Sequence, residues 1–234
     1  MRPRRTAARA MLGAVLFVCP TLFAAQATPA HSPALAEVTF HYERPGVPVP
    51  LFTLRIREDG TGSYQADQVA TSYSDTAMRG QAAQRIDRPL TVSPAMAAKI
   101  FTAARGADRF DTVCASKAKN IADTGAKTLS YTGADGSGSC VFNYTENKNA
   151  SMLTDVFVGI ASTMDEGRKL EFLHRYDRLG LDAEMNFLSQ EVAAGRALEL
   201  GTISSTLSAI AEDPELMQRV RLRASRMLEQ SQSR

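Results

Sequence analysis

The sequence predicts an α+β protein: an antiparallel sheet of hairpins packed with helices, followed by an all-helical C-terminal appendage. Two observations lead to this prediction. In the first half of the chain, apolar and polar residues alternate over short runs joined by turn-forming residues, as in antiparallel strands with one buried face. From Asp165 onward, apolar residues instead recur every three or four positions, which is typical of helices that bury one side.

The first strands are expected to form a hairpin next to a preceding strand. Residues 38–42 alternate between apolar and polar side chains, and residues 52–56 repeat the pattern. Asp59-Gly60 then separates residues 52–56 from residues 61–65. An Asp-Gly pair between two alternating runs indicates a tight hairpin, because glycine supplies the positive φ that the turn needs.

A further strand and the first helix are expected after an exposed loop at residues 66–84. The strand covers residues 85–92, and Pro89 within it indicates an edge of the sheet, because proline cannot donate to a neighbouring strand. Ser93-Pro94 then predicts a helix start, since serine caps free N–H groups and proline fits the first turn. Gly106 is expected to end this helix.

A second hairpin is predicted in the centre of the chain. Residues 127–132 and 139–145 form its arms, and the glycine-rich residues 133–138 join them. The apolar residues 151–160 are compatible with a strand or a helix. Helix is favoured because three apolar side chains fall on one face: Leu153, Phe157 and Ile160.

The remaining chain is predicted to be helical throughout. Helices are expected to end at Gly180 and Gly195, and the last one to begin at Asp213-Pro214-Glu215. The expected buried stripes are Leu170, Leu173 and Tyr176; Met185, Leu188 and Val192; Leu200, Ile203, Leu207 and Ile210; and Leu216, Val220, Ala224 and Met227.

The first 27 residues have the order of an export signal. Four arginines precede an apolar run at residues 10–18, and Ala25-Gln26-Ala27 is a small-x-small cleavage site. The apolar run is too short to span a bilayer core of roughly 30 Å, and no second run approaches that length. We therefore expect a bacterial protein that is periplasmic or secreted after cleavage near Ala27, with no transmembrane segment in the mature chain.

Two other interpretations of the leader have weaker support. Lipid attachment at Cys19 requires a small residue just before the cysteine, and Val18 occupies that position. Twin-arginine export at Arg4-Arg5 is usually marked by an apolar pair after the arginines, which Thr6-Ala7-Ala8 does not supply.

The predicted organisation has four parts: a signal peptide at 1–27, a flexible lead at 28–37, an α+β domain at 38–178 and a helical C-terminal region at 179–234. Without the leader, 23 basic and 25 acidic side chains remain, a net charge of −2. Nucleic-acid binding requires a concentrated basic face, so this balance predicts no nucleic-acid partner.

The cysteines predict a disulfide. Cys114 and Cys140 are the two that remain after the leader is removed, and an even pair in an exported chain is oxidised by default. Closing a loop of this length is worth roughly 3.5 kcal/mol on the chain-entropy model. The alternative is that Cys114 stays free and reactive beside Lys117 and Lys119, but the chain has no Cys-x-x-Cys redox spacing.

Two segments resemble uncharacterised secreted bacterial α+β proteins. They are Phe52-Thr53-Leu54-Arg55-Ile56 before Asp59-Gly60 and Tyr64, and Leu90-Thr91-Val92-Ser93 leading to Phe110. The similarity extends over residues 38–176. It implies an α+β fold, supplies no known catalytic residues to transfer and leaves the function open.

Familiar catalytic and metal motifs are incomplete. Ser116-Lys117-Ala118-Lys119 matches the acylation motif of penicillin-recognising enzymes, but Lys127-Thr128-Leu129 replaces the Lys-Thr-Gly strand that those enzymes place far downstream. The histidines outside the leader, His31, His41 and His174, have no metal-ligand spacing. The sequence therefore predicts no cofactor, no metal site and no catalytic residue.

Two functions remain open. The first is a non-catalytic domain that binds an unknown protein or small-molecule partner in the cell envelope through the sheet edge or the helical appendage. The second is an extracytoplasmic hydrolase of unrecognised type, whose acids would converge in one cleft from Asp75, Asp87, Asp108 or Asp111. In the last helix, Arg219, Arg221, Arg223 and Arg226 form either a basic face for an acidic partner or, the favoured interpretation, a solvated face.

Overall fold

The structure, a computed structural model, describes residues 35–47, 49–68 and 84–232. The predicted signal peptide at 1–27, most of the flexible lead, His31 and Asp75 lie outside these ranges. Most of the predicted loop at 66–84 also lies outside them.

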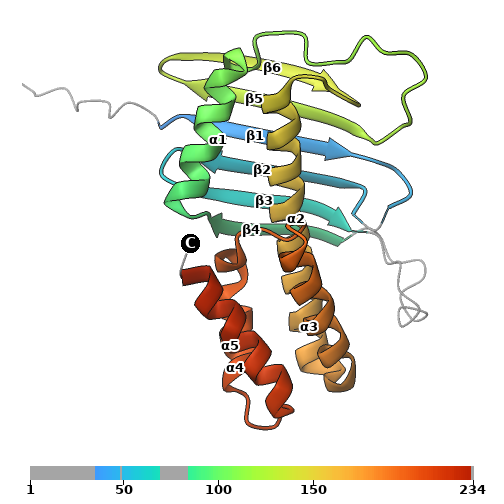
Figure 1. Cartoon of the computed structure of the whole chain (residues 1–234), viewed down its shortest axis with the longest axis vertical. Helices are drawn as coiled ribbons and strands as arrows, with labels where there is room; N and C mark the ends of the chain where they lie inside the picture. The colour runs from blue at the N-terminus through green and yellow to red at the C-terminus, as the bar shows by residue number, and fades with distance from the viewer. Residues whose placement is uncertain (1–34, 48, 69–83, 233–234) are drawn as a thin grey trace, which may run out of the picture. The chain divides into compact units, whose positions relative to one another are not determined.

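Six strands form one antiparallel sheet in the spatial order β4-β3-β2-β1-β5-β6 (Figure 1). Every pair of adjacent strands in the sheet is antiparallel. All of these pairs except β1–β5 also join strands that are consecutive along the chain. The strands are β1 (Glu37–Glu43), β2 (Leu51–Arg57), β3 (Thr61–Gln68), β4 (Gln84–Thr91), β5 (Ala126–Gly133) and β6 (Gly136–Phe142).

Helices cover one face of this sheet and continue beyond its β4 edge (Figure 1). The long helix α2 first crosses the strands and then runs past β4, where the later helices pack beside it. The predicted α+β fold with a helical C-terminal region is confirmed. The helical elements are α1 (Pro94–Gly106), α2 (Lys148–Tyr176), α3 (Arg178–Ala193), α4 (Ser204–Glu212) and α5 (Gln218–Gln232), with the 3-10 turns η2 (Asp108–Phe110) and η3 (Leu200–Ile203).

The core fills the space between the sheet and α1 and α2 and continues among the C-terminal helices. Apolar side chains at alternate strand positions, such as Val38, Phe40 and Leu54, are fully buried there. Phe40 also stacks on Phe157 of α2, with the ring centroids 5.3 Å apart. The intervening side chains, Thr39 among them, point to the opposite face of the sheet, which is mostly polar.

Several structural features that were predicted from short sequence motifs are confirmed. Gly60 has a φ of 84° in the β2–β3 turn, and Pro89 lies in β4, an edge strand. The Ser93 side chain accepts a hydrogen bond from the Met96 N–H at the start of α1, which ends at Gly106. These signals depend on a few neighbouring residues, so the rest of the fold is not needed to interpret them.

Three predicted boundaries are wrong. Residues 151–160 are helical, but they belong to α2, which continues without a break through Asp165. Gly180 does not end a helix, because the break comes at Asp177, whose side chain accepts from the Gly180 N–H and caps α3. The last helix begins at Gln218, because the Asp213 side chain accepts from the Glu215 N–H in a turn instead of capping a helix.

The β5–β6 connection is tighter than the six-residue loop predicted at 133–138. Ala134 and Asp135 alone separate the two strands. The Tyr131 hydroxyl donates to Asp135 over 2.5 Å, and the Arg105 guanidinium donates to the same carboxylate over 3.1 Å. These bonds, the Tyr131 bond above all, hold the Asp135 pKa well below its usual value. The carboxylate thus fixes the turn.

Candidate functional site

One candidate site among the described residues is a groove of about 970 Å³ beside the edge strand β4. We call it the arginine groove. Helix α2 forms its opposite wall, and the segments around α3 and α4 complete it. The groove is lined by Arg85, Ile86, Asp87 and Arg88 of β4; Arg168, Glu171, Phe172, His174, Arg175 and Tyr176 of α2; and Arg178, Thr206, Ala209 and Asp213.

An ion pair between β4 and α2 lies in the lining of the groove. Two guanidinium nitrogens of Arg88 each lie 2.7 Å from an oxygen of Glu171. The Thr206 hydroxyl of α4 donates to Glu171 over 3.0 Å. The bonds from Arg88, more than the one from Thr206, lower the pKa of Glu171. Three elements are thereby joined through one carboxylate.

A second carboxylate in the groove is also paired. Asp213 Oδ2 lies 2.9 Å from His174 Nε2, and this hydrogen bond is the main cause of the lowered pKa of Asp213. Arg178 lies 3.9 Å from the same carboxylate and also pairs with Glu215. Asp213 is therefore held between two basic groups of the α2–α3 corner.

Two arginines of the groove have no carboxylate partner within the described part of the chain. Arg85 of β4 and Arg175 of α2 are both exposed. The guanidinium carbon of Arg175 lies 5.9 Å from the ring centroid of Tyr176, which is a cation–π distance. These two cations are therefore available to an external anion.

Exposed aromatic side chains lie beside Arg175. Phe172 and Tyr176 are 44% and 67% exposed, and their ring centroids lie 5.0 Å apart. Exposed aromatic rings next to arginines are typical of binding surfaces, because both groups bury large contact areas. The groove thus combines positive charge with an apolar ledge.

The groove was not predicted from the sequence, although the sequence of α2 contains a pattern that indicates one of its walls. Arg168, Glu171, Phe172 and Arg175 follow the i, i+3, i+4, i+7 spacing of one helix face. A mixed charged and aromatic stripe on a helix can indicate a wall of a binding site. The opposite wall is β4, which only the tertiary fold brings next to α2.

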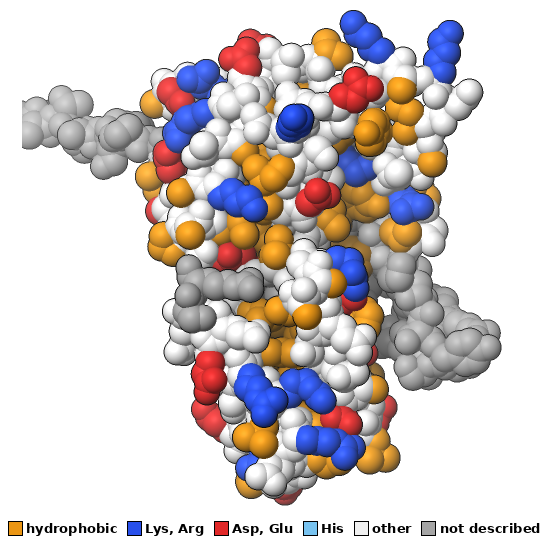
Figure 2. Space-filling view, in the orientation of Figure 1, with side chains coloured by type: hydrophobic (Ala, Val, Ile, Leu, Met, Phe, Trp, Pro, Cys, Tyr) orange, Lys and Arg blue, Asp and Glu red, His pale blue; other side chains and the backbone are white. Residues whose placement is uncertain are grey.

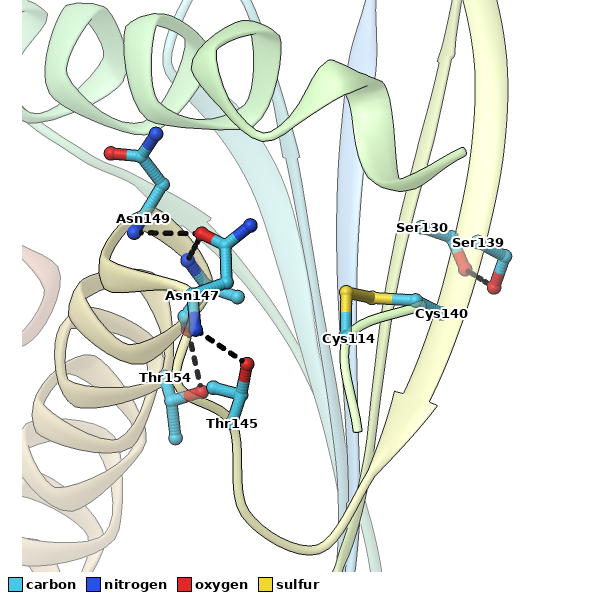
Figure 3. The surroundings of a disulfide bond; sticks show 9 residues. Cys114, Ser130, Ser139, Cys140, Thr145, Asn147, Asn149 and Thr154 are labelled. Atoms are coloured by element: carbon cyan, nitrogen blue, oxygen red, sulfur yellow. Dashed lines mark hydrogen bonds between the residues drawn. A yellow bond between two sulfur atoms is a disulfide. The ribbon is translucent and has the colours of Figure 1, made fainter. Parts of the chain in front are cut away.

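The predicted cysteine pair lies at the other end of the sheet. The sulfur atoms of Cys114 and Cys140 are at bonding distance, with their Cα atoms 5.7 Å apart, and join the segment after η2 to β6 (Figure 3). Both residues are buried. Beside them in Figure 3, the Asn147 side chain accepts from two N–H groups and caps α2. The pair braces the β6 edge and lies outside the groove.

The acids proposed for the hydrolase are not brought together among the described residues. Asp87 lines the groove and accepts from the Gln65 side chain over 3.0 Å. Asp108 and Asp111 are exposed at η2, which packs on β6 at the opposite edge of the sheet. Asp75 lies outside the described ranges.

The histidines are also separated. His41 lies on the polar sheet face with Nδ1 2.8 Å from the Thr53 hydroxyl, whereas His174 lies in the groove. Within residues 35–47, 49–68 and 84–232, no three metal-ligating side chains are grouped so that they could hold an ion.

A buried acid lies between α2 and α3. Glu166 is only 4% exposed, and its Oε1 accepts from Lys169 over 2.5 Å. Its Oε2 has no hydrogen-bond partner among the described residues. Burial raises the pKa of Glu166 to about 8, and the carboxyl of Glu184 acts in the same direction. The raised pKa favours the protonated form of this buried acid.

Two arginines of α5 take part in the packing of the helices. Figure 2 shows basic side chains gathered over the helical region beyond β4, with acidic ones beside them. Arg219 and Arg223 lie 2.9 and 3.1 Å from the Asp182 carboxylate of α3. These contacts bind α5 to α3, so neither arginine is merely solvated.

A comparison with models of known protein families and with curated proteins finds no match to this chain. Within the described ranges, no helix has both the length and the hydrophobicity needed to span a bilayer. Function is therefore inferred from the geometry of the chain itself.

Proposed function

We propose that this chain is an exported, non-catalytic binding domain whose ligand site is the arginine groove. The ligand is anionic and belongs to a protein or small-molecule partner in the cell envelope. One observation carries the proposal: five arginines and three carboxylates line a single groove, and Arg85 and Arg175 have no carboxylate partner in the described chain.

Arginine is suited to such a role. Its guanidinium stays charged at all physiological pH values and presents paired donors that match a carboxylate or a phosphate. The Arg88–Glu171 pair joins the two walls, so Arg85 on β4 and Arg175 on α2 are carried by elements that are held together. A groove built before the ligand arrives loses less entropy on binding.

An extracytoplasmic location is supported by the leader and by the cysteine pair. Disulfides persist in oxidising compartments and are rare in the cytosol. The order of charged, apolar and small residues before Ala27 is typical of a cleaved export signal.

The hydrolase alternative has less support. Asp87 lines the groove, but Asp108 and Asp111 lie at the opposite edge of the sheet. The other two carboxylates in the lining, Glu171 and Asp213, are engaged by Arg88 and His174. The acids present therefore act as partners of basic groups.

The test is a titration of the mature protein with fluorescein-labelled hexaglutamate, followed by fluorescence anisotropy. The double variant Arg85→Gln/Arg175→Gln is expected to weaken binding at least tenfold. The control Arg55→Gln/Arg226→Gln removes the same charge from exposed arginines outside the groove, and should change affinity less than twofold. Equal weakening by both pairs would mean that net charge, and not the groove, attracts the peptide.

A further inference from the structure

The hydrogen-bond register shows which backbone groups of β4 face the groove. The Val92 N–H donates to the Gly60 carbonyl over 2.9 Å, so Gly60 and Val92 form a hydrogen-bonded pair at the end of the β3–β4 ladder. In antiparallel strands, hydrogen-bonded and non-hydrogen-bonded pairs alternate. Residues 86, 88 and 90 therefore bond to β3, and residues 85, 87, 89 and 91 direct their N–H and C=O groups outward.

Pro89 agrees with this register. It occupies an outward position, where its missing N–H breaks no bond to β3. On its N-terminal side, Arg85 and Asp87 keep their outward N–H and C=O groups, and both residues line the groove. No described backbone group bonds to these groups. A short length of strand edge, unpaired within the described ranges, thus forms one wall of the arginine groove.

We propose that an extended segment of a partner protein, with acidic side chains at alternate positions, adds to β4 as a seventh strand within the arginine groove. This inference rests on the proposed function and names the partner class. Exposed strand edges bind extended peptides through main-chain hydrogen bonds, while alternate side chains supply specificity.

The charge and the geometry of the groove indicate which side chains the added strand has at the positions that face α2. Along a strand, side chains at every second position point to the same face. Arg88 lies on the face of β4 that is turned toward α2, because it pairs with Glu171. Every second side chain of the added strand would likewise face α2, where Arg168 and Arg175 line the groove. Acidic side chains at those positions meet guanidinium groups.

Pro89 limits the length of the pairing. Strand addition needs outward donors on β4, and these are present at Arg85 and Asp87 and missing at Pro89. Pairing is therefore centred on residues 84–88. The partner segment spans about five residues at roughly 3.4 Å each.

The probe is the peptide Thr-Glu-Thr-Glu-Thr-Glu-Thr, labelled with fluorescein and titrated into the mature protein. Along a strand, the N–H groups of successive residues point alternately toward and away from the neighbouring strand. In an added strand, the N–H groups that face β4 therefore belong either to the Glu residues or to the Thr residues. Two methylated peptides are therefore compared, one with N-methyl groups on every Glu and one with them on the internal Thr residues. Strand addition predicts that one loses at least tenfold in affinity while the other stays within threefold of the parent.

The matched protein variants act on the β4 side of the same pairing. Asp87→Pro removes one outward N–H, as Pro89 already does in the natural sequence, and leaves the bonds to β3 intact. Asp87→Ala removes the same carboxylate and its bond from Gln65 but keeps the N–H. We expect Asp87→Pro to bind the parent peptide at least fivefold more weakly than Asp87→Ala does, with both variants folded by circular dichroism.

The outcomes separate this inference from the proposed function. If both methylated peptides bind like the parent, strand addition is wrong, whatever Asp87→Pro does. The arginine groove would still stand as an anion site if Arg85→Gln/Arg175→Gln weakened the parent peptide. If the parent peptide and hexaglutamate both fail to bind, both proposals are wrong.

Discussion

Arg88 and Glu171 form a two-point ion pair, in which each of two guanidinium nitrogens lies 2.7 Å from a carboxylate oxygen. Arg88 belongs to the edge strand of the sheet, and Glu171 to the part of α2 that lies beside this edge. The pair therefore fixes the distance between the two walls of the arginine groove, and Thr206 adds a contact from α4.

Replacing Arg88 should destabilise the fold. We expect Arg88→Ala to lower the free energy of unfolding by about 1 kcal/mol. This value is near the upper end of the contributions that exposed ion pairs make to stability, because the contact is bidentate. Urea unfolding followed by circular dichroism measures this. Arg57→Ala is the matched control, since Arg57 is more exposed and lies 3.7 Å from Glu37. A loss no larger than that of the control would show that the pair contributes little.

The cysteine pair should stabilise the β6 edge. Converting Cys114 and Cys140 to serine together is expected to lower the free energy of unfolding by roughly 3.5 kcal/mol, chiefly because the unfolded chain gains freedom. Mass spectrometry after alkylation, with and without reductant, establishes the bond in the natural protein. Two alkylated thiols in the unreduced sample would contradict it.

Glu166 should make the protein less stable as pH rises. Its carboxyl has an ordinary pKa of 4.5, and burial in the folded state raises it to about 8. Between these values the folded state binds more protons than the unfolded state, so the free energy of unfolding falls with pH, by up to about 1.4 kcal/mol per unit. The loss is complete above the folded pKa.

Glu166→Gln tests this directly, because the amide cannot ionise. We expect the variant to be more stable than the natural protein at pH 8, similar at pH 4.5, and flatter in its pH dependence between the two. The exposed residue Glu229 supplies the control Glu229→Gln. An unchanged pH profile in Glu166→Gln would show that the buried acid is ionised at neutral pH.

Close packing of η2 on β6 should make Gly138 intolerant of a side chain. A Cβ atom at this position would lie 2.5 Å from the Arg109 carbonyl oxygen and 2.6 Å from the Asp111 nitrogen. Because both are backbone atoms, Gly138→Ala should cost about 2 kcal/mol or more. Gly201→Ala is the control, because its Cβ would meet nothing within 4 Å, and it should change stability little. Thermal unfolding measures both variants. Equal unfolding midpoints for Gly138→Ala and Gly201→Ala would refute the close approach of η2 to β6.

The sequence predicted well those features that a few neighbouring residues determine. Asp59-Gly60 specifies its turn through glycine φ, Pro89 indicates an edge through its missing N–H, and Ser93 caps α1. The unbroken path of α2 was missed because the apolar residues 151–160 and the apolar stripe after Asp165 were treated as separate segments. Glu166, next to Asp165, is buried inside the continuous helix.

The candidate site could not be predicted in the same way, because its walls are distant in sequence. Arg88 and Glu171 are 83 residues apart, and each is an ordinary surface charge in its own segment. Their meeting depends on the position of β4 in the sheet and on the length of α2 beyond it. The expectation of binding at the sheet edge or the helical appendage remains a prediction, and the groove offers it a specific location.

The most direct measurement of the central claim is a ¹H–¹⁵N spectrum of the mature protein titrated with the unlabelled peptide Thr-Glu-Thr-Glu-Thr-Glu-Thr. If the arginine groove binds acidic segments, amide shifts should concentrate at residues 85–88 and 168–178. Shifts confined to α5 or to the polar face of the sheet, or no shifts at saturating peptide, would contradict the account.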